Sequence, residues 1–290
     1  MKKISLLFIM LFAACSFLFA KNDTDSAKLL EQQIKEYAKL MDSVNKALKY
    51  ETGKVLLPAG IASMNIVKGF KYLNKEQSTY VVEELWGNLP QEGLQGMLFP
   101  QDSDPFADSS YAYIISYNPM GFVKDKDAKT IDYDDLMKGM KKDDEEENKQ
   151  RVAAGLSSLN MVGWAAKPFY DEQKKVMHWA LELKAGDVDE NTLNYKIIML
   201  GRKGVLTLNA IASISQLNKV KADVDKVLNA AQFSEGNQYK DFDSKVDDVA
   251  AWTVGGLVAG KVLAKVGFLA KFWKFIMIGI VALGGWFIKL

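Results

Sequence analysis

The feature that most constrains the fold is a pair of strand-like runs, LNYKIIML at 193–200 and VLTLNAIA at 205–212. Both runs are rich in aliphatic residues, and the four residues between them, GRKG, form a turn bounded by glycines. Two such runs joined by so short a turn are typical of a β-hairpin. The sheet that contains them is therefore expected to be antiparallel.

Further strand-like runs stand before this hairpin, at 54–57 (KVLL), 111–117 (YAYIISY), 159–166 (LNMVGWAA) and 176–184 (VMHWALELK). From 159 to 212 the runs follow one another without a helix between them. This succession favours an antiparallel meander over a doubly wound parallel sheet. The predicted fold class is α+β, a mostly antiparallel sheet with flanking helices.

Two segments outside the meander have helical spacing of apolar residues. In 26–50 these residues step by four and three: Leu30, Ile34, Tyr37, Met41, Val44 and Leu48. Such a stripe predicts a helix that either packs on the domain or forms a short dimer seam, so a homo-oligomer is one expected partner. A second helix, with one apolar face, is predicted at 215–232.

The N-terminus, MKKISLLFIMLFAACSFLFAKND, has the layout of a secretory signal peptide: two lysines, a long apolar run and polar residues. Cleavage is expected after Ala20, and an uncleaved N-terminal anchor is the alternative. Phe12 occupies the place where a lipoprotein signal usually has leucine, so lipidation of Cys15 is not expected. The mature chain would then contain no cysteine and no disulfide.

The C-terminal segment 249–290 carries five lysines, no acidic residues and two lysine-free apolar runs, Val249–Gly260 and Phe275–Ile288. Each run is shorter than the roughly 20 residues of a membrane span. We therefore expect a membrane hairpin in which the two helices pair, with 261–274 at the cytoplasmic end. Gly256 and Gly260 form a G-x-x-x-G pair that permits close helix packing. An amphipathic helix lying on the membrane surface is the alternative.

These ends predict the domain organisation: a signal peptide at 1–20, an N-terminal helix at 21–52, an extracytoplasmic domain at 53–248 and an anchoring hairpin at 249–290. Residues 21–248 contain thirty basic and thirty-six acidic residues, a net charge of −6. An acidic body with a basic apolar tail points to membrane lipid as a partner and not to nucleic acid. The expected location of the domain is the periplasmic side of the inner membrane.

The acidic stretch GFVKDKDAKTIDYDDL at 121–136 fails as a calcium loop. Counted from Asp125, Lys129 takes a ligand position and Leu136 takes the place of the bidentate acid. Asp132 is better explained as the N-cap of a helix, whereas this reasoning leaves Asp125 and Asp127 without a role. The run KKDDEEENK at 141–149 is expected to be a solvated loop or a frayed helix end.

Motifs of common catalytic sites are missing from the sequence, which contains no G-x-S-x-G, H-E-x-x-H, P-loop or G-x-G-x-x-G. The single histidine, His178, lies on a strand and is expected to be half exposed. No cofactor and no metal are expected, and the lack of catalytic motifs favours a protein that is not an enzyme. A carboxylate-dependent hydrolase remains an alternative, because two acids suffice for glycoside hydrolysis.

Compact polar-aromatic clusters occur at ELWGN (84–88), GWAAKPFYD (163–171) and LNYKIIMLGRKG (193–204). Such clusters form either a saccharide or peptide groove, or core anchors with a hydrogen-bonded polar tip. With the acidic stretch they supply the candidate surface residues, which are Trp86, Asn88, Asp125, Asp127, Arg151, Trp164, Tyr170, Asp171 and Arg202.

These clusters, together with VLLPAGIASMN, GFKYL, GMLFP, YNPMGFVKDKDAKTIDYDDL, HWALEL and VGGLVAGKVLAKVG, give the chain a family resemblance. It resembles the bacterial family of uncharacterised membrane-anchored proteins grouped as domain of unknown function 2167, over roughly residues 50–270. Val67 and Leu89 stand where that family has prolines, and Met64 where it has leucine. The resemblance implies an exported, membrane-tethered domain with no established activity, and a family-level label proposes regulation of amylopullulanase. GFVKDKDA belongs to the family signature.

The leading hypothesis is a non-enzymatic binding or scaffolding module of the cell envelope, whose partner is an envelope protein or a saccharide. The first rival is a hydrolase or regulator that acts on polysaccharide. A deep acidic cleft joining Asp125, Asp127 and Asp171 would favour this rival. The second rival is a subunit of a membrane assembly.

Overall fold

The computed structural model describes residues 23–107, 111–153, 158–186 and 189–259. The chain divides into two compact units, Met1–Lys46 with Lys274–Leu290, and Ala47–Trp273. Helix α2 (Asp23–Ala47) is the described part of the first unit and confirms the helix predicted at 26–50. Ile34 of the predicted seam is exposed, and the role of α2 in a dimer stays a prediction. The signal peptide predicted at 1–20 lies outside the described residues.

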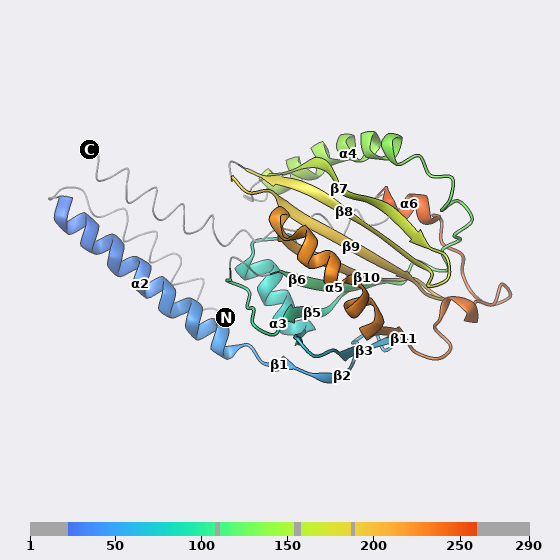
Figure 1. The fold of residues 1–290 in the computed structure, drawn as a ribbon, viewed down its shortest axis with the longest axis horizontal. Coiled ribbons are helices and arrows are strands. Elements are labelled where there is room, and N and C mark those ends of the chain that lie inside the picture. The colour runs from blue at the N-terminus through green and yellow to red at the C-terminus, as the bar shows by residue number, and fades with distance from the viewer. Residues whose placement is uncertain (1–22, 108–110, 154–157, 187–188, 260–290) are drawn as a thin grey trace. The chain divides into compact units, whose positions relative to one another are not determined.

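The second unit is built on an antiparallel sheet of eight strands in the order β1-β4-β5-β6-β10-β9-β8-β7 (Figure 1). The strands are β1 (Tyr50–Glu51), β4 (Phe70–Asn74), β5 (Leu94–Pro100), β6 (Ala112–Asn118), β7 (Leu159–Asp171), β8 (Val176–Ala185), β9 (Thr192–Leu200) and β10 (Val205–Ser213). Strands β7 to β10 form the predicted meander, with each strand paired to the next. The α+β class with a large antiparallel sheet is confirmed.

The predicted hairpin is formed by β9 and β10, with Leu200 opposite Val205. The amide of Gly201 donates to the carbonyl of Gly204 at 2.9 Å and closes the turn. A Cβ atom at Gly204 would lie 2.1 Å from the carbonyl oxygen of Asn118. Glycine is required at this position because the neighbouring chain passes too close for any side chain.

A second, three-stranded sheet has the order β11-β3-β2, formed by β2 (Gly53–Leu56), β3 (Ala62–Ile66) and β11 (Ala231–Phe233). Strand β2 confirms the run predicted at 54–57, whereas β1, β3, β4, β5 and β11 were not predicted. Strand β5 explains why: LQGMLFP is buried on both faces and shows no alternation. Its Gly96 lies against the Tyr72 hydroxyl, 2.3 Å from where a Cβ would be.

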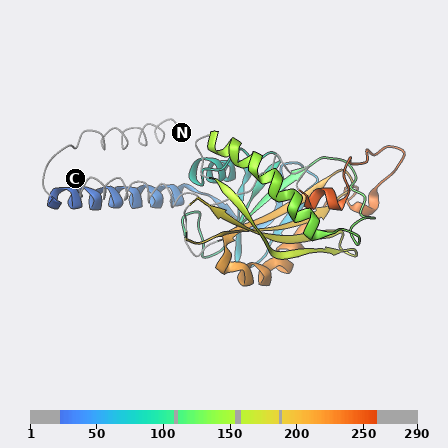
Figure 2. The ribbon, with the colours of Figure 1, turned by 90° about the horizontal axis from the view of Figure 1, so that it is seen from above.

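Helices cover both faces of the large sheet. Helix α5 (Leu217–Ala230) confirms the helix predicted at 215–232 and buries Val220 and Val227 in the main core. Helix α3 (Lys75–Thr79) and the π-helical turn Tyr80–Leu85 form a second core with Trp86. Figure 2 shows α4 (Tyr133–Ala153) and α5 on opposite sides of the sheet. Short 3₁₀ turns lie at Ile214–Gln216 and Tyr239–Asp241.

Helix α4 corrects the interpretation of the charged run 141–149. Asp132 caps the helix as predicted, accepting hydrogen bonds from the amides of Asp134 and Asp135 at 3.0 Å. The prediction of a solvated loop at 141–149 is wrong, because the helix continues through these residues to Ala153. Asp144 is buried and accepts a hydrogen bond from the amide of Met161, 2.8 Å away on the edge strand β7. Buried side chains of α4 thus satisfy backbone groups that have no neighbouring strand.

The beginning of the predicted membrane hairpin is part of the folded body. Helix α6 (Val254–Val258) buries Val254, Leu257 and Val258 completely. None of the helices in the described ranges is long and apolar enough to cross a membrane. The remainder of the predicted hairpin, 260–290 with Gly260, lies outside the described residues. The expected boundary at 248/249 would separate α6 from the residues that it contacts, such as Asp127.

Candidate functional site

The candidate site is centred on the signature loop, defined as residues 121–128 (GFVKDKDA), between β6 and α4. Gly121 has a φ of 91°, and a Cβ there would lie 2.9 Å from the carbonyl oxygen of Asp248. The amide of Phe122 donates to that carbonyl at 2.8 Å, and the carbonyl of Phe122 accepts from Ala250 at 2.9 Å. Glycine therefore allows the signature loop to pair with a segment more than a hundred residues away.

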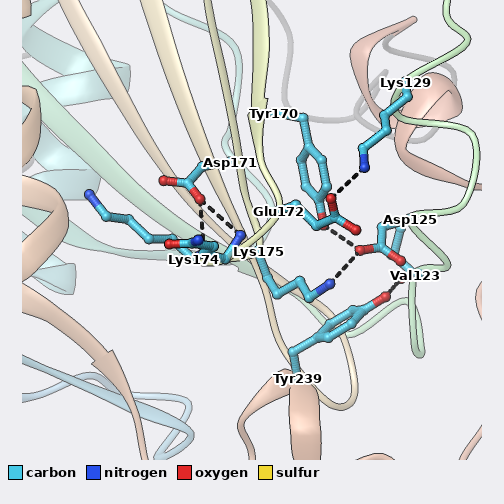
Figure 3. A network of polar contacts seen from close by, with 10 residues as sticks. Val123, Asp125, Lys129, Tyr170, Asp171, Glu172, Lys174, Lys175 and Tyr239 are labelled. Carbon is cyan, nitrogen blue, oxygen red and sulfur yellow. Dashed lines mark hydrogen bonds and ion pairs between the residues drawn. The ribbon is translucent and has the colours of Figure 1, made fainter.

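Asp125 joins the signature loop to the turn between β7 and β8 (Figure 3). One carboxylate oxygen accepts hydrogen bonds from the Tyr170 hydroxyl at 2.6 Å and from the Lys175 ammonium group at 2.8 Å. Partial burial alone would raise the pKa of Asp125, but the bonds from Lys175 and Tyr170 outweigh it and lower that pKa. Asp125 is therefore an ionised, tightly engaged carboxylate.

Aromatic rings extend this contact to the segment 239–242. The Tyr239 hydroxyl donates to the carbonyl of Val123 at 2.9 Å (Figure 3). The Phe122 ring stacks on Tyr239 with centroids 4.4 Å apart and on Phe242 with centroids 3.8 Å apart. The Lys175 ammonium group lies 5.2 Å from the Tyr239 ring centroid. The first half of the signature loop is thus held on several sides.

Asp127 joins the signature loop to helix α6. Its carboxylate accepts hydrogen bonds from the Thr253 hydroxyl and, at 3.1 Å, from the amide of Gly255. Both donors belong to the start of α6, where backbone amides have no partner within the helix. A Cβ at Gly255 would lie 3.0 Å from the same carboxylate oxygen, which favours glycine there. Gly256, predicted to pack helices, instead faces the Trp252 side chain.

Arg202, at the turn between β9 and β10, holds the middle of the segment that connects Phe242 to α6. Its Nε donates to Asp247 at 2.7 Å and its guanidinium also donates to the carbonyl of Gly236 at 3.1 Å. Asp247 accepts a further bond from the amide of Asp243 at 2.7 Å. The bond from Arg202 lowers the pKa of Asp247. This ion pair therefore fixes the segment against the sheet.

The remaining candidate residues serve other contacts. Trp86 is buried and donates to the carbonyl of Pro105 at 2.9 Å, and Asn88 is buried and donates to the carbonyl of Val82 at 3.2 Å. Both side chains are therefore buried and have hydrogen-bonded polar groups.

Three candidates lie along α4 and β7. Trp164 donates to the carbonyl of Tyr133 at 3.2 Å, and Arg151 is buried on α4. Asp171 accepts from the amides of Gln173 and Lys174, within its own turn. Among the predicted residues, the structure joins Asp125 and Tyr170 by a direct hydrogen bond.

Four functional contacts were missed by sequence reasoning: those of Lys175, Tyr239, Asp247 and Thr253. Their partners are 45 to 126 positions away along the chain. One local signal existed only in the backbone, since Lys175 has a φ of 56°, unusual for a residue with a side chain. Their residue types are common at surfaces, so the sequence carries no pattern that selects them.

The three acids that would support a hydrolase have separate partners: Asp125 holds Tyr170, Asp127 holds Thr253, and Asp171 caps its own turn. His178 is half-buried as predicted, with Nδ1 2.8 Å from the Tyr195 hydroxyl, and burial lowers its pKa. Within the described ranges, no three His, Cys, Asp or Glu residues are grouped as metal ligands.

A pocket of about 270 Å³ lies elsewhere, between the β3–β4 turn, the end of β5 and helix α5. It is lined by Lys68, Tyr111, Lys219 and Asp223 among others, and by none of the candidate residues.

Comparison with protein families matches residues 49–285 to the family described as protein of unknown function, DUF2167. The chain belongs to this family. The resemblance inferred from the motifs is confirmed, and the DUF2167 match includes the whole signature loop, α4 and α6. The search among curated proteins gives no match.

Two solved structures are similar to this DUF2167 chain. A cyanobacterial PsbP from Synechocystis sp. PCC 6803 has 12% identity and a TM-score of 0.35, covering 64% of this chain and 92% of its own. The Saccharomyces cerevisiae Ran-binding protein Mog1p has 9% identity and a TM-score of 0.32, covering 64% of this chain and 95% of its own. At these scores the likeness carries no argument about function.

Proposed function

We propose that this protein is a non-enzymatic binding module of the cell envelope, exported and held at the membrane through the chain that follows α6. The proposal depends on which groups the side chains of the signature loop contact. Asp125 and Asp127 bind other segments of the same chain, and Asp127 holds the segment that leads into the basic, apolar C-terminus. The signature loop therefore serves to hold the folded body to the segment that precedes the C-terminal residues 260–290.

A catalytic role for the same carboxylates is less favourable. A nucleophile or general base needs an oxygen that a substrate can approach. The Asp125 oxygen already accepts two hydrogen bonds, from Tyr170 and Lys175. We therefore place the polysaccharide hydrolase second, and an envelope protein or a saccharide remains the proposed binding partner.

Topology labelling tests the location directly. Cysteine is introduced at Lys138, whose side chain is 78% exposed on α4, or at Lys271 in the tail, in a chain whose Cys15 is serine. A membrane-impermeant thiol reagent applied to intact spheroplasts should label Lys138→Cys and spare Lys271→Cys. The opposite pattern, or recovery of the chain in the soluble fraction, would refute the proposal. Crosslinking from Lys138→Cys in native membranes then identifies the partner.

A further inference from the structure

The segment 242–252 carries a concentration of exposed apolar side chains. Val246, Val249 and Trp252 are 72%, 46% and 41% exposed. They are three of eight large apolar side chains exposed in the described ranges, yet they fall within seven consecutive residues. Figures 1 and 2 show the segment extending beyond the end of the sheet. Single exposed apolar residues are ordinary on protein surfaces, whereas a cluster marks an interaction site.

This segment is held in place and does not hang free. Phe242 stacks on Phe122 at one end, and Thr253 is bound to Asp127 at the other. Between them, the Asp247 side chain is only 1% exposed and is paired with Arg202 at 2.7 Å. The signature loop and Arg202 thus hold three apolar side chains outward at a fixed position, although burying them would favour folding.

The composition of the chain that follows indicates lipid as the partner of these three side chains. Ala259, at the end of the described segment, is followed by residues 260–290, which contain five lysines and many Phe, Ile, Leu, Val and Trp residues but no acid. This composition suits a bilayer and its interface, and tryptophan concentrates at that interface. We propose that Val246, Val249 and Trp252 form a membrane-contact patch that inserts into the interfacial layer beside the tail. This inference rests on the proposed function, because it requires that the protein is attached to a membrane.

The charged residues around the patch indicate whether lipid charge contributes to its binding. Asp243 and Asp248 are exposed beside it, as are Lys245 and Lys203, the second of which acts on Asp247. These charges balance, so the contact of the patch is driven by apolar burial and not by attraction to lipid charge. The patch therefore inserts into zwitterionic phosphatidylcholine, and moderate salt leaves the insertion unchanged.

Depth-dependent quenching tests the patch. The mature full-length chain, with one cysteine at Val246 or Val249 and a bimane label on it, is reconstituted in phosphatidylcholine vesicles. Lys138→Cys, exposed on α4, is the matched control. Lipids brominated near the headgroup should quench the label and blue-shift its emission at Val246→Cys and Val249→Cys. The Lys138→Cys label should keep its intensity.

The outcomes separate the patch from the attachment. A vesicle-bound chain whose labels at Val246→Cys and Val249→Cys are not quenched overturns the patch and leaves membrane attachment standing. A chain that floats free of the vesicles overturns both. Quenching at Lys138→Cys as well would indicate unspecific adsorption and overturn the patch. Labels that stay bright in vesicles but crosslink to a protein in native membranes would assign the surface to a protein partner.

Discussion

Ending the chain after Asp248 or after Ala259 should give two proteins of very different stability. The shorter chain lacks Val254, Leu257 and Val258, each 0% exposed. Burying one such side chain is worth about 1.5–3 kcal/mol, so the three contribute roughly 4.5–9 kcal/mol. This is an upper value, because real unfolded chains already bury some apolar surface. It is nevertheless comparable with the whole net stability of a domain, about 5–15 kcal/mol.

Urea unfolding followed by far-ultraviolet circular dichroism measures the difference. Both chains begin at residue 21 and lack 260–290, so only the segment 249–259 differs. The chain that ends at Ala259 should unfold in one cooperative transition. With an m-value near 3 kcal/mol per molar, the chain that ends at Asp248 should have its midpoint lower by roughly 1.5–3 M, or no transition at all.

Single substitutions in the longer chain separate packing from chain length. Leu257→Ala should lower the free energy of unfolding by about 2–5 kcal/mol, because it opens a cavity in a fully buried position. Val246→Ala, at a position 72% exposed, should change it by less than about 0.5 kcal/mol. Equal urea midpoints for the two truncated chains would refute the reasoning and show that α6 is not part of the fold.

Four further substitutions, at three positions, test the polar contacts. Tyr170→Phe removes the 2.6 Å bond to Asp125 and should cost about 1–2 kcal/mol in urea unfolding, since that acceptor is charged. Because the pKa of Asp125 is lowered on folding, its contribution is complete above the unfolded value near 4 and is lost as pH falls through the folded value. Asp125→Asn should therefore flatten the loss of stability on the acid side, and an unchanged acid titration would contradict this. Burial raises the pKa of Asp144, so its ionised form opposes folding at neutral pH. Asp144→Asn, which keeps an acceptor for Met161, should be neutral or stabilising at pH 7 in thermal melts, whereas Asp144→Ala should cost about 1–3 kcal/mol.

The sequence predicts the strands whose pattern is local. The runs at 193–200 and 205–212 are aliphatic and joined by a short glycine-bounded turn, so their pairing follows from nearby residues alone. Strands such as LQGMLFP show no recognisable pattern, because burial on both faces removes the alternation of apolar and polar residues that marks a half-buried strand. The same limit applies to β11, only three residues long and paired with a strand far away in sequence.

The charged run 141–149 shows a different limit. Acids and lysines in succession normally indicate a solvated segment. Here Asp144 and Asn148 accept hydrogen bonds from the amides of Met161 and Leu159, at 2.8 and 2.6 Å. The need for them arises from the unpaired edge of β7, which becomes apparent only once the strand order is known. A polar residue that completes a sheet edge cannot be told from a surface residue by its own sequence context.

The two aspartates of the signature loop differ in what they join, and this difference explains why the sequence assigned neither of them a role. Asp125 holds a turn of the meander, so its contacts lie within the sheet that the strand runs already predict. Asp127 holds Thr253 and Gly255, in a segment that sequence composition alone assigns to the membrane. Because these two contacts are made with the signature loop, the residues around Thr253 belong to the folded body. The folded body therefore extends through α6, and Asp127 fixes the start of that helix against the signature loop.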